Sequence, residues 1–256
     1  MIRTDILGFN EDPNKLFIYV VNISDNESNI TLFWGYLSTK EKKQVKKYSL
    51  NRLSNKYIIT HGILRYILSH HTGLLPQDIE FTYNKEGKPF LKKSNIQFNI
   101  SHSHDIVSYA VALNCRLGID IEFKDNNLNI EDLADFVFNQ EERKFFSILD
   151  SNAKFEFFYN LWTKKESIIK AIGFGLSYPL NNINIIPFLS EDKVVFNYKK
   201  KELYCYLLEM PAGYAGAITI DRKLWLKDHV LILSLNSFSF PQANNSKFEP
   251  IISIDE

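Results

Sequence analysis

Strand-like and helix-like segments alternate in both halves of this 256-residue chain, and this alternation is the feature that most limits its fold. Short apolar runs of the kind found in strands occur at 16–23, 79–91, 95–123, 194–198, 204–210 and 214–220. Helical sequence fills 38–73 and begins again near Asn129. A Gly-rich phosphate loop does not follow the first strand-like run, so a dinucleotide-binding fold is disfavoured. The order of segments therefore predicts an α+β fold.

Two acids stand in the strand-like sequence Gly-Ile-Asp-Ile-Glu at 118–122. Side chains of an extended chain alternate between two faces, so Asp120 and Glu122 share one face and the two isoleucines share the other. Two carboxylates this close raise each other's cost of ionisation unless a cation or hydrogen bonds lie between them. The stretch therefore indicates a bound cation.

Composition and charge restrict the function classes. The formal net charge is zero, which gives no sign of a nucleic-acid ligand or of an anionic membrane surface. Two cysteines, Cys115 and Cys205, are too few for a disulfide framework, and no apolar run approaches the roughly 18 residues of a membrane span. A cytoplasmic protein without a membrane segment is expected.

The charges are divided unevenly along the chain. Residues 1–113 carry 14 Lys and Arg against 10 Asp and Glu, a balance of +4, whereas residues 114–256 carry 16 against 20, a balance of −4. This division suits a polyanionic ligand held by the first half and a metal held by the second.

A second group of candidate residues lies in the helical sequence 155–175. Its apolar residues recur at helical spacing and form a core-facing stripe: Phe158, Leu161, Trp162, Ile168, Ile169 and Ile172. Glu166 and Lys170 are one turn apart at the edge of the stripe, and Lys165 falls inside it. On this helix alone, the simplest explanation is a solvated Glu–Lys pair beside a snorkelling Lys165.

Asp120, Glu122 and Glu166 together change this interpretation. Three carboxylates around an open site are the ligands that a hard cation such as Mg²⁺ takes, with water or phosphate oxygens completing the shell. Lys165 and Lys170 would then face the same phosphate. The combination points to metal-assisted phosphoryl chemistry.

The sequence Asn-Ile-Ser-His-Ser-His-Asp at 99–105 offers hydroxyl and imidazole groups between two strand-like runs. His102 and His104 resemble a zinc pair, but no third ligand follows at metal spacing. Phosphate binding by Ser101 and His102 is the better functional interpretation. A turn capped by Ser103 and Asp105 is the structural alternative.

Four of these blocks carry a resemblance to a known family. They are GKPFL at 87–91, FNISHS at 98–103, LGIDIE at 117–122 and LWTKKESIIKAIGFGL at 161–176. In this order and spacing they resemble the signature set of the surfactin-type 4′-phosphopantetheinyl transferases. A weaker match includes the basic helical segment and FVFNQEE at 136–142, and extends to about residue 220.

The resemblance implies an activity and a fold. Members of this family move the phosphopantetheine arm of coenzyme A to a serine of an apo carrier protein (acyl, peptidyl or aryl), release adenosine 3′,5′-bisphosphate, and need Mg²⁺, with Mn²⁺ as the alternative. They fold as two similar α/β subdomains related by a pseudo-twofold, with coenzyme A in the cleft. We therefore expect a monomer with an N-terminal subdomain at 1–113 and a C-terminal subdomain at 114–256, with a variable tail after about residue 240.

The resemblance also implies residue roles. Asp120, Glu122 and Glu166 would bind the metal, with Glu166 as the candidate base and Lys170 as its catalytic neighbour. The coenzyme A contacts that it implies are Lys165 and Lys170 for the pyrophosphate, Gly87, Lys88 and Pro89 for the nucleotide end, and Ser101 and His102 for the 3′-phosphate. Lys56 stands where the family commonly has arginine, Glu41 and Gln44 stand where it often has basic residues, and Glu141 matches an acid sometimes assigned a role related to that of Glu166.

Two other functions are compatible with the same residues. A metal-dependent phosphoester hydrolase would use the three acids without a carrier protein. A catalytically silent carrier-binding or nucleotide-binding module would need no complete metal site, and the presence of Asp120, Glu122, Glu166 and Lys170 argues against it.

Overall fold

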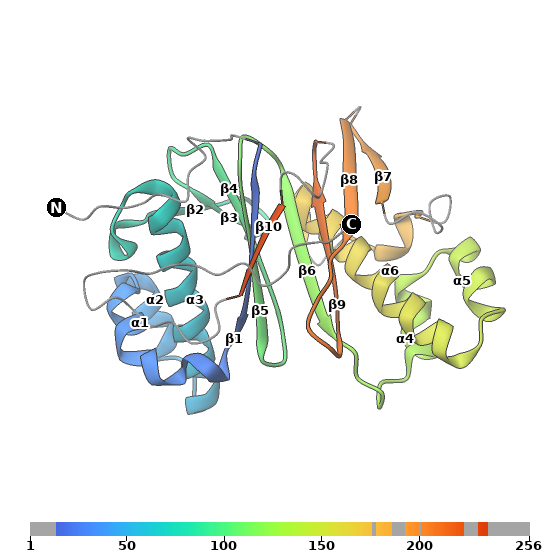
Figure 1. Ribbon diagram of the computed structural model, residues 1–256, viewed down its shortest axis with the longest axis horizontal. Helices are drawn as coiled ribbons and strands as arrows, with labels where there is room; N and C mark the ends of the chain where they lie inside the picture. The colour runs from blue at the N-terminus through green and yellow to red at the C-terminus, as the bar shows by residue number, and fades with distance from the viewer. Residues whose placement is uncertain (1–13, 176–177, 186–192, 200, 223–229, 235–256) are drawn as a thin grey trace.

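The protein consists of two four-stranded sheets, each covered on its outer face by helices (Figure 1). The computed structural model describes residues 14–175, 178–185, 193–199, 201–222 and 230–234. The first sheet has the order β10-β1-β5-β4, with β1 Leu16–Asn22, β4 Ile96–Ser103, β5 Ile106–Leu113 and β10 Val230–Ser234. The second sheet has the order β6-β9-β8-β7, with β6 Leu117–Phe123, β7 Lys193–Tyr198, β8 Lys201–Leu207 and β9 Tyr214–Ile220.

Helices flank the two sheets on opposite sides (Figure 1). The first half contains η1 Ser24–Asn29, α1 Ile30–Tyr36, α2 Thr39–Val45, α3 Asn51–Thr72, η2 Pro76–Asp78 and the hairpin β2 Phe81–Tyr83 with β3 Pro89–Leu91. The second half contains α4 Ile130–Val137, α5 Gln140–Ser147, α6 Ser151–Ile172 and η4 Leu180–Asn182. Each half is thus built around a sheet and one 22-residue helix, α3 or α6, which agrees with the expected pair of similar α/β halves in an α+β fold.

The alternation of side chains along β1 places the sheets in the middle of the molecule. Phe17 and Tyr19 belong to the core beneath α3, whereas Leu16 and Ile18 belong to a second core shared with Ile119 and other residues of the second sheet. Because β1 is buried on both faces, its sequence is a continuous apolar run. The layers therefore follow the order helices, sheet, sheet, helices.

Close contact between β6 and α6 depends on Gly118. A Cβ atom at this position would lie 2.3 Å from the Ser167 carbonyl oxygen and 2.3 Å from the Ala171 nitrogen. Ile119 and Ile121 face the core between the sheets, so the side chains at the alternate positions of β6 face α6. The strand therefore carries Asp120 and Glu122 toward the helix that carries Glu166 and Lys170.

Residues 114–116 connect β5 of the first sheet to β6 of the second, but the second half does not end in its own sheet. Strand β10 pairs in parallel with β1, with Leu16 opposite Val230. The chain thus returns to the first sheet after completing the second. The expected variable tail after about residue 240 lies outside the described residues. None of the described helices has both the length and the apolar character needed to cross a bilayer.

Candidate active site

Asp120 lies at the centre of the site, between the first sheet and α6. Its Oδ1 atom accepts hydrogen bonds from the Lys170 ammonium at 2.6 Å and from the Ser101 hydroxyl at 2.9 Å. Lys170 also donates to Ser101 Oγ at 2.8 Å. Asp120 is only 3% exposed, so this carboxylate depends on these partners for its solvation. The interpretation of Glu166 and Lys170 as a solvated surface pair is therefore wrong for Lys170, which pairs with Asp120.

Glu122 and Glu166 surround the Asp120–Lys170 pair. Glu122 is half-buried and accepts a hydrogen bond from the Ser103 hydroxyl at 2.9 Å. Burial and the neighbouring Asp120 charge raise the pKa of Glu122 to about 7. Burial and the Asp120 charge also raise the pKa of Glu166 above its ordinary range. The three predicted acids thus form one electrostatically coupled group.

This group has the chemical character of a cation site, although it is not closed around one. Asp120 Oδ2 is buried and has no hydrogen-bond partner among the described residues. Within the described part of the chain, no three His, Cys, Asp or Glu side chains already converge at metal-binding distances. An orphaned carboxylate oxygen beside two acids that are hard to ionise is what a divalent cation would relieve, because its charge stabilises all three carboxylates.

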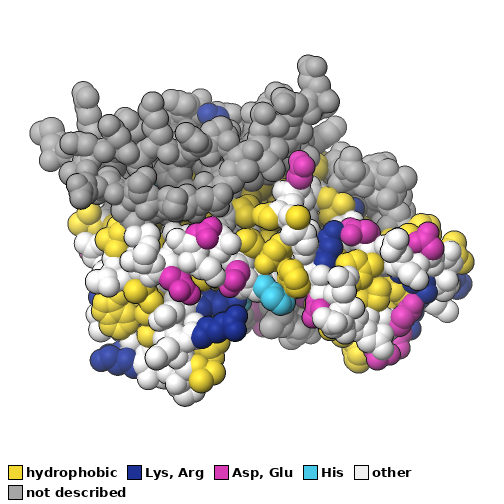
Figure 2. All heavy atoms as spheres, turned by 60° about the horizontal axis from the view of Figure 1, so that its bottom comes forward, with side chains coloured by type: hydrophobic (Ala, Val, Ile, Leu, Met, Phe, Trp, Pro, Cys, Tyr) yellow, Lys and Arg dark blue, Asp and Glu magenta, His cyan; other side chains and the backbone are white. Residues whose placement is uncertain are grey.

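Basic and imidazole groups line the first-half side of the site. His102 lies near the end of β4. Its side chain reaches the surface, but the surrounding protein removes part of its hydration, and this loss together with the charges of Lys56, Lys170 and His61 lowers the pKa of His102. The Lys56 ammonium donates to the His104 carbonyl at 2.7 Å, which holds it beside this strand end. Figure 2 shows Lys and Arg side chains of the first half next to histidine side chains near the middle of the molecule. The arrangement favours an anionic ligand here.

The predicted turn around Lys88 is present, and the Lys88 side chain points toward β6 and α6. Gly87 has a φ of 86°, a conformation that glycine adopts without strain, and Pro89 begins β3. The Lys88 ammonium donates to the carbonyls of Lys170 at 2.6 Å and Leu117 at 2.8 Å. Burial and the Arg116 charge lower the pKa of Lys88 to about 8.

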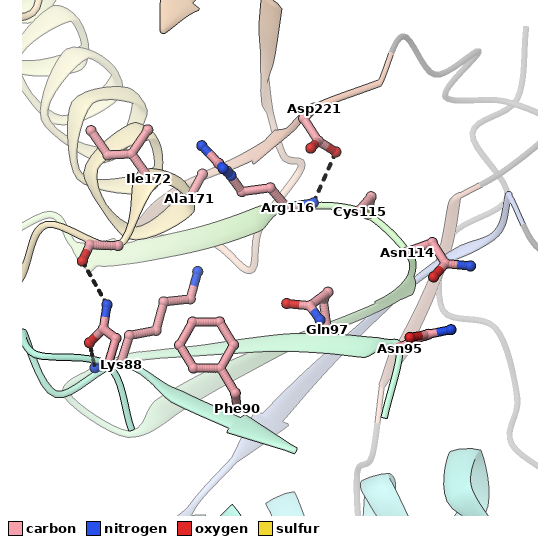
Figure 3. Close-up of a pocket in the computed structure, with 12 residues that line it drawn as sticks. Lys88, Phe90, Asn95, Gln97, Asn114, Cys115, Arg116, Ala171, Ile172 and Asp221 are labelled. Carbon is pink, nitrogen blue, oxygen red and sulfur yellow. Dashed lines mark hydrogen bonds between the residues drawn. The ribbon is translucent and has the colours of Figure 1, made fainter. Parts of the chain in front are cut away.

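Lys88 also lines a cavity of about 390 Å³ beside the end of α6 (Figure 3). Phe90, Gln97, Arg116 and Gly173 are among its other lining residues. Lys88 links the wall of this cavity to α6 through its hydrogen bond to the Lys170 carbonyl, whereas Asp120, Glu122 and Glu166 are not among the lining residues. Its polar lining and its two cations suit a polar or anionic part of a ligand.

The structure contradicts the expected role of Lys165. Its side chain is fully buried, and its ammonium donates to the Val137 carbonyl at 2.7 Å and to the Glu142 carboxylate. Glu142 is equally buried and also accepts from the backbone nitrogen of Asn139, at the start of α5. Lys165 is one position away from Glu166 and therefore points about 100° away around the helix. It joins α5 to α6, and within the described part of the chain its ammonium makes no hydrogen bond to Asp120, Glu122 or Glu166.

Ser101 also differs from its expected role as a 3′-phosphate ligand. Its hydroxyl hydrogen is given to Asp120, and its oxygen accepts from Lys170 and from the backbone nitrogen of Ile121 at 3.2 Å. A serine hydroxyl has one hydrogen, so Ser101 has none to offer a phosphate in this arrangement. Ser103, a turn cap in the structural alternative, donates its hydroxyl hydrogen to Glu122.

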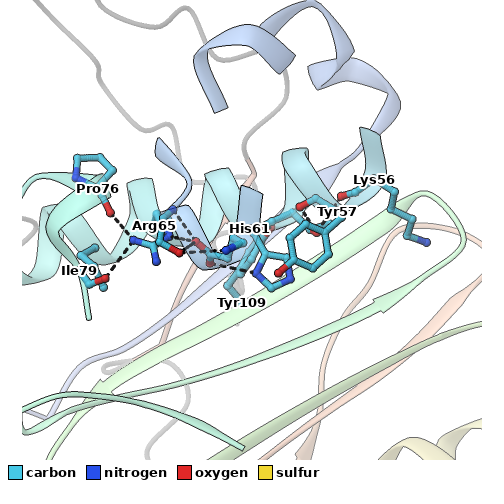
Figure 4. Close-up of polar contacts among 10 residues, drawn as sticks. Lys56, Tyr57, His61, Arg65, Pro76, Ile79 and Tyr109 are labelled. Atoms are coloured by element: carbon cyan, nitrogen blue, oxygen red, sulfur yellow. Dashed lines mark hydrogen bonds and ion pairs between the residues drawn. The ribbon is translucent and has the colours of Figure 1, made fainter. Parts of the chain in front are cut away.

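Glu41, on α2, stands where the family often has a basic residue and belongs to a buried network with Arg65 of α3. Figure 4 shows Arg65 of this network directed at Pro76 and Ile79. Glu41 accepts from Arg65 Nε at 2.8 Å and forms a capping box with Ser38. His61 Nδ1 lies 3.6 Å from its other oxygen, and the His61 ring stacks on Tyr57. Burial alone would raise the pKa of Glu41, but these hydrogen bonds and the Arg65 charge lower it to about 2. Glu141, in contrast, is exposed and accepts from Asn184 at 3.1 Å.

Comparisons with known proteins place both halves of the chain in one family. Residues 116–219 match the 4′-phosphopantetheinyl transferase superfamily, and residues 24–114 match the family described as 4′-phosphopantetheinyl transferase, N-terminal. The two matches divide close to the turn between β5 and β6. Together they cover both halves of the site.

Three curated relatives span most of the chain. The 4′-phosphopantetheinyl transferase gsp of Aneurinibacillus migulanus is 31% identical over 78% of this chain and 82% of its own length. The 4′-phosphopantetheinyl transferase Sfp of Bacillus subtilis (strain 168) is 28% identical over 73% of this chain and 83% of its own. The 4′-phosphopantetheinyl transferase HetI of Nostoc sp. is 28% identical over 64% and 71%.

The fold and the site thus define a two-half enzyme scaffold with an acidic centre at the junction of its halves. The chain belongs to the 4′-phosphopantetheinyl transferase family, and its similarity to Sfp and gsp groups it with the surfactin-type members.

Proposed function

We propose that this protein transfers the 4′-phosphopantetheine group of coenzyme A to a serine of an apo carrier protein. The observation that carries the proposal is the coupled group of Asp120, Glu122, Glu166 and Lys170 at the junction of the two halves. It lies beside the basic residues Lys56 and His102, which suit a polyanionic substrate such as coenzyme A. The family of the chain supports the same conclusion.

The reaction exchanges the phosphoanhydride bond of the coenzyme A pyrophosphate for a phosphate ester bond to the carrier serine. The serine hydroxyl oxygen of the carrier forms a bond to the phosphorus of the phosphopantetheine phosphate. The pyrophosphate bond breaks, and adenosine 3′,5′-bisphosphate leaves with its electron pair. The hydroxyl proton goes to Glu166, directly or through a water, because a carboxylate whose pKa is raised is a better base near neutral pH.

Lys170 is suited to stabilise charge on the substrate. Its side chain is 25% exposed, and two of the three ammonium hydrogens are directed at Asp120 and Ser101. The third hydrogen is available to a phosphate oxygen. Asp120 thereby orients the ammonium for a charge that grows on the pyrophosphate during bond breaking.

The oxygen atoms of Asp120, Glu122 and Glu166 fit a hard cation. We propose that these carboxylates are ligands of Mg²⁺, with Mn²⁺ as the alternative ion. When bound, such an ion would neutralise part of the charge on the pyrophosphate. The protein is proposed to act in the cytoplasm as a monomer, with coenzyme A and a carrier protein as its only partners.

His102 is the proposed reader of the 3′-phosphate of coenzyme A. Because its pKa is lowered, His102 is neutral in the free protein at pH 7 and would bind the phosphate through a ring N–H. We expect His102→Ala to lose roughly ten- to a hundredfold in kcat/KM with coenzyme A, since a hydrogen bond to a charged group contributes about 1.5–3 kcal/mol. Dephospho-coenzyme A lacks this phosphate, so its kcat/KM should change much less. Equal losses on both substrates would assign His102 to the fold.

Gly87, Lys88 and Pro89 are proposed to hold the nucleotide end of coenzyme A through the cavity that Lys88 lines. Lys56 is proposed to supply a positive charge near the 3′-phosphate, since its charge acts on His102. Both proposals concern contacts with parts of coenzyme A that are remote from the bond being broken. The binding energy of such contacts helps to position the reacting phosphorus.

Incubation of the full chain with coenzyme A, Mg²⁺ and a panel of apo carrier proteins tests the function. Mass spectrometry of the intact carriers should show the addition of one phosphopantetheine group to at least one of them. The addition should stop when a chelator removes the metal. Hydrolysis of coenzyme A in water, with no carrier modified, would instead identify a phosphoester hydrolase.

A further inference from the structure

Strands β4 and β6 join the two halves through side chains. β4 is at one edge of the first sheet, and β6 is at one edge of the second. Three β4 side chains accept hydrogen bonds from backbone nitrogens of β6: Asn99 from Ile119 at 2.8 Å, Ser101 from Ile121 at 3.2 Å, and Ser103 from Phe123 at 3.0 Å. We call these three side chains the β4 ladder. The ladder satisfies backbone groups that an unpaired sheet edge would leave without partners.

Two members of the β4 ladder direct their hydroxyl hydrogens at the acids of β6. Ser101 donates to Asp120 and Ser103 donates to Glu122, each at 2.9 Å. Each serine oxygen accepts the backbone N–H through one of its lone pairs. The single hydroxyl hydrogen is then left to donate to the carboxylate. Asn99 makes the same backbone contact, but the β6 residue at the position corresponding to the two acids is Gly118, which has no side chain.

We propose that Ser101 and Ser103 are positioning residues that hold the Asp120 and Glu122 carboxylates in the orientation in which they bind a divalent cation. The inference rests on the proposed metal role of these acids. Hydrogen bonds to the ligands of a metal fix the ligands' orientation, and losing one typically costs 10- to 100-fold in metal affinity.

Ser103 is the more informative of the two serines. Asp120 is also held by Lys170, so the loss of Ser101 leaves a second partner in place. Within the described part of the chain, the Ser103 hydroxyl is the one hydrogen-bond donor to the Glu122 carboxylate. Ser103 is half-buried near the end of β4, so a change of its side chain disturbs little packing. Because it comes from the first half and Glu122 from the second, the geometry of the acids depends on how the halves meet.

The experiment compares Ser103→Thr with Ser103→Val in the full chain. Threonine and valine have the same shape and the same preference for strands, and they differ in the hydroxyl that bonds Glu122. Binding of Mn²⁺ alone, without coenzyme A, is measured by electron paramagnetic resonance of the free ion, and Mg²⁺ affinity is measured by competition. We expect the Thr variant to stay within about threefold of the wild type and the Val variant to lose about 10- to 100-fold in affinity.

Asn99→Ala is the matched control for the loss of a ladder contact. It removes a hydrogen bond to β6 without touching an acid, so it should lower the melting temperature and leave Mn²⁺ affinity within about twofold. Should Ser103→Val not fold by circular dichroism, Ser103→Ala supplies the variant without a hydroxyl. Equal Mn²⁺ affinities for the Thr variant and the hydroxyl-free variant would overturn the inference and leave the transfer reaction standing. A wild-type protein that modifies carriers without binding Mn²⁺ or Mg²⁺ would overturn the metal role itself.

Discussion

A single buried carboxylate, Asp120, sets the electrostatics of the site. Burial raises its pKa, and the Lys170 charge and the hydrogen bonds from Lys170 and Ser101 oppose this effect. We expect Asp120→Asn to keep the fold, because asparagine has the same size and still accepts a hydrogen bond from Lys170. The amide cannot neutralise a cation, so metal affinity should fall and transfer should drop by several orders of magnitude.

Circular dichroism and Mg²⁺-dependent kinetics measure these two effects. Glu80→Gln is the matched control, since Glu80 is exposed and pairs with Lys92 far along the chain from the acids. Near-normal turnover of the Asp120 variant would remove Asp120 from the site.

The face on which the acids lie could be predicted from the sequence, but their partners could not. The period of two along 118–122 is a local property of any extended chain, so it places Asp120 and Glu122 together without knowledge of the fold. The role of Ser101 depends on β4 lying beside β6, which is a contact between two sheet edges. A motif that contains a serine and a histidine near a phosphate site does not distinguish a serine that binds phosphate from one that holds an acid.

At the scale of elements, the contact between α5 and α6 depends on the buried Lys165–Glu142 pair. Burial lowers the pKa of Lys165, and the Glu142 charge opposes this effect. Lys165→Met should destabilise the protein by about 3–5 kcal/mol, because it leaves Glu142 buried without a countercharge. Urea unfolding measures this loss.

The double variant Lys165→Met, Glu142→Gln should be less destabilised than the sum of its single variants, because it buries no uncompensated charge. Strict additivity would contradict the pairing. The helical period correctly placed Lys165 among apolar residues. It could not identify Glu142 as the partner, because the two residues are 23 positions apart and meet only after α5 folds onto α6.

Helix α3 packs against β1 through a histidine that is buried in its neutral form. His71 Nε2 lies 2.8 Å from the Tyr19 hydroxyl, and burial lowers the pKa of His71 from 6.5 to about 3. As the pH falls below 6.5, the unfolded chain takes up a proton that the folded protein excludes. The contribution of His71 to stability is therefore present above pH 6.5 and is lost between pH 6.5 and 3.

We expect His71→Gln to keep a hydrogen bond with Tyr19 and to remove this titration. The difference in unfolding free energy between pH 7.5 and pH 5, measured with urea, should then be smaller in the variant than in the wild type. Equal differences in the two proteins would mean that His71 accepts the proton without unfolding.

At the scale of the whole molecule, the two-half organisation could be predicted, and the path of the chain end could not. The alternation of segments and the change of charge near residue 113 both follow from local sequence. The pairing of β10 with β1 joins residues more than 200 positions apart, and the apolar run at 230–234 fits the edge of either sheet. Which edge it occupies depends on which strand still has an open side after both sheets form.

The uneven charge of the two halves predicts how the enzyme meets its carrier protein. The resemblance to the surfactin-type enzymes implies that carriers are acidic, and the first half has a charge balance of +4. Exposed lysines of this half gather at α2 and just after it: Lys40, Lys43, Lys46 and Lys47. Charges of opposite sign speed the encounter of two proteins, and dissolved salt screens this attraction. The screening length falls from about 10 Å to about 3 Å between about 0.1 M and about 1 M salt.

We therefore expect the KM for an apo carrier to rise over this range while kcat, which reports steps after the encounter, changes little. Steady-state kinetics at saturating coenzyme A, with carrier modification as the readout, measure both quantities. The double variant Lys46→Glu, Lys47→Glu should have a higher KM at low salt and a weaker dependence on salt, since it removes the charges being screened. A KM that stays flat in the wild type, or falls with salt as in a mainly apolar encounter, would show that the charge of the first half does not guide the carrier.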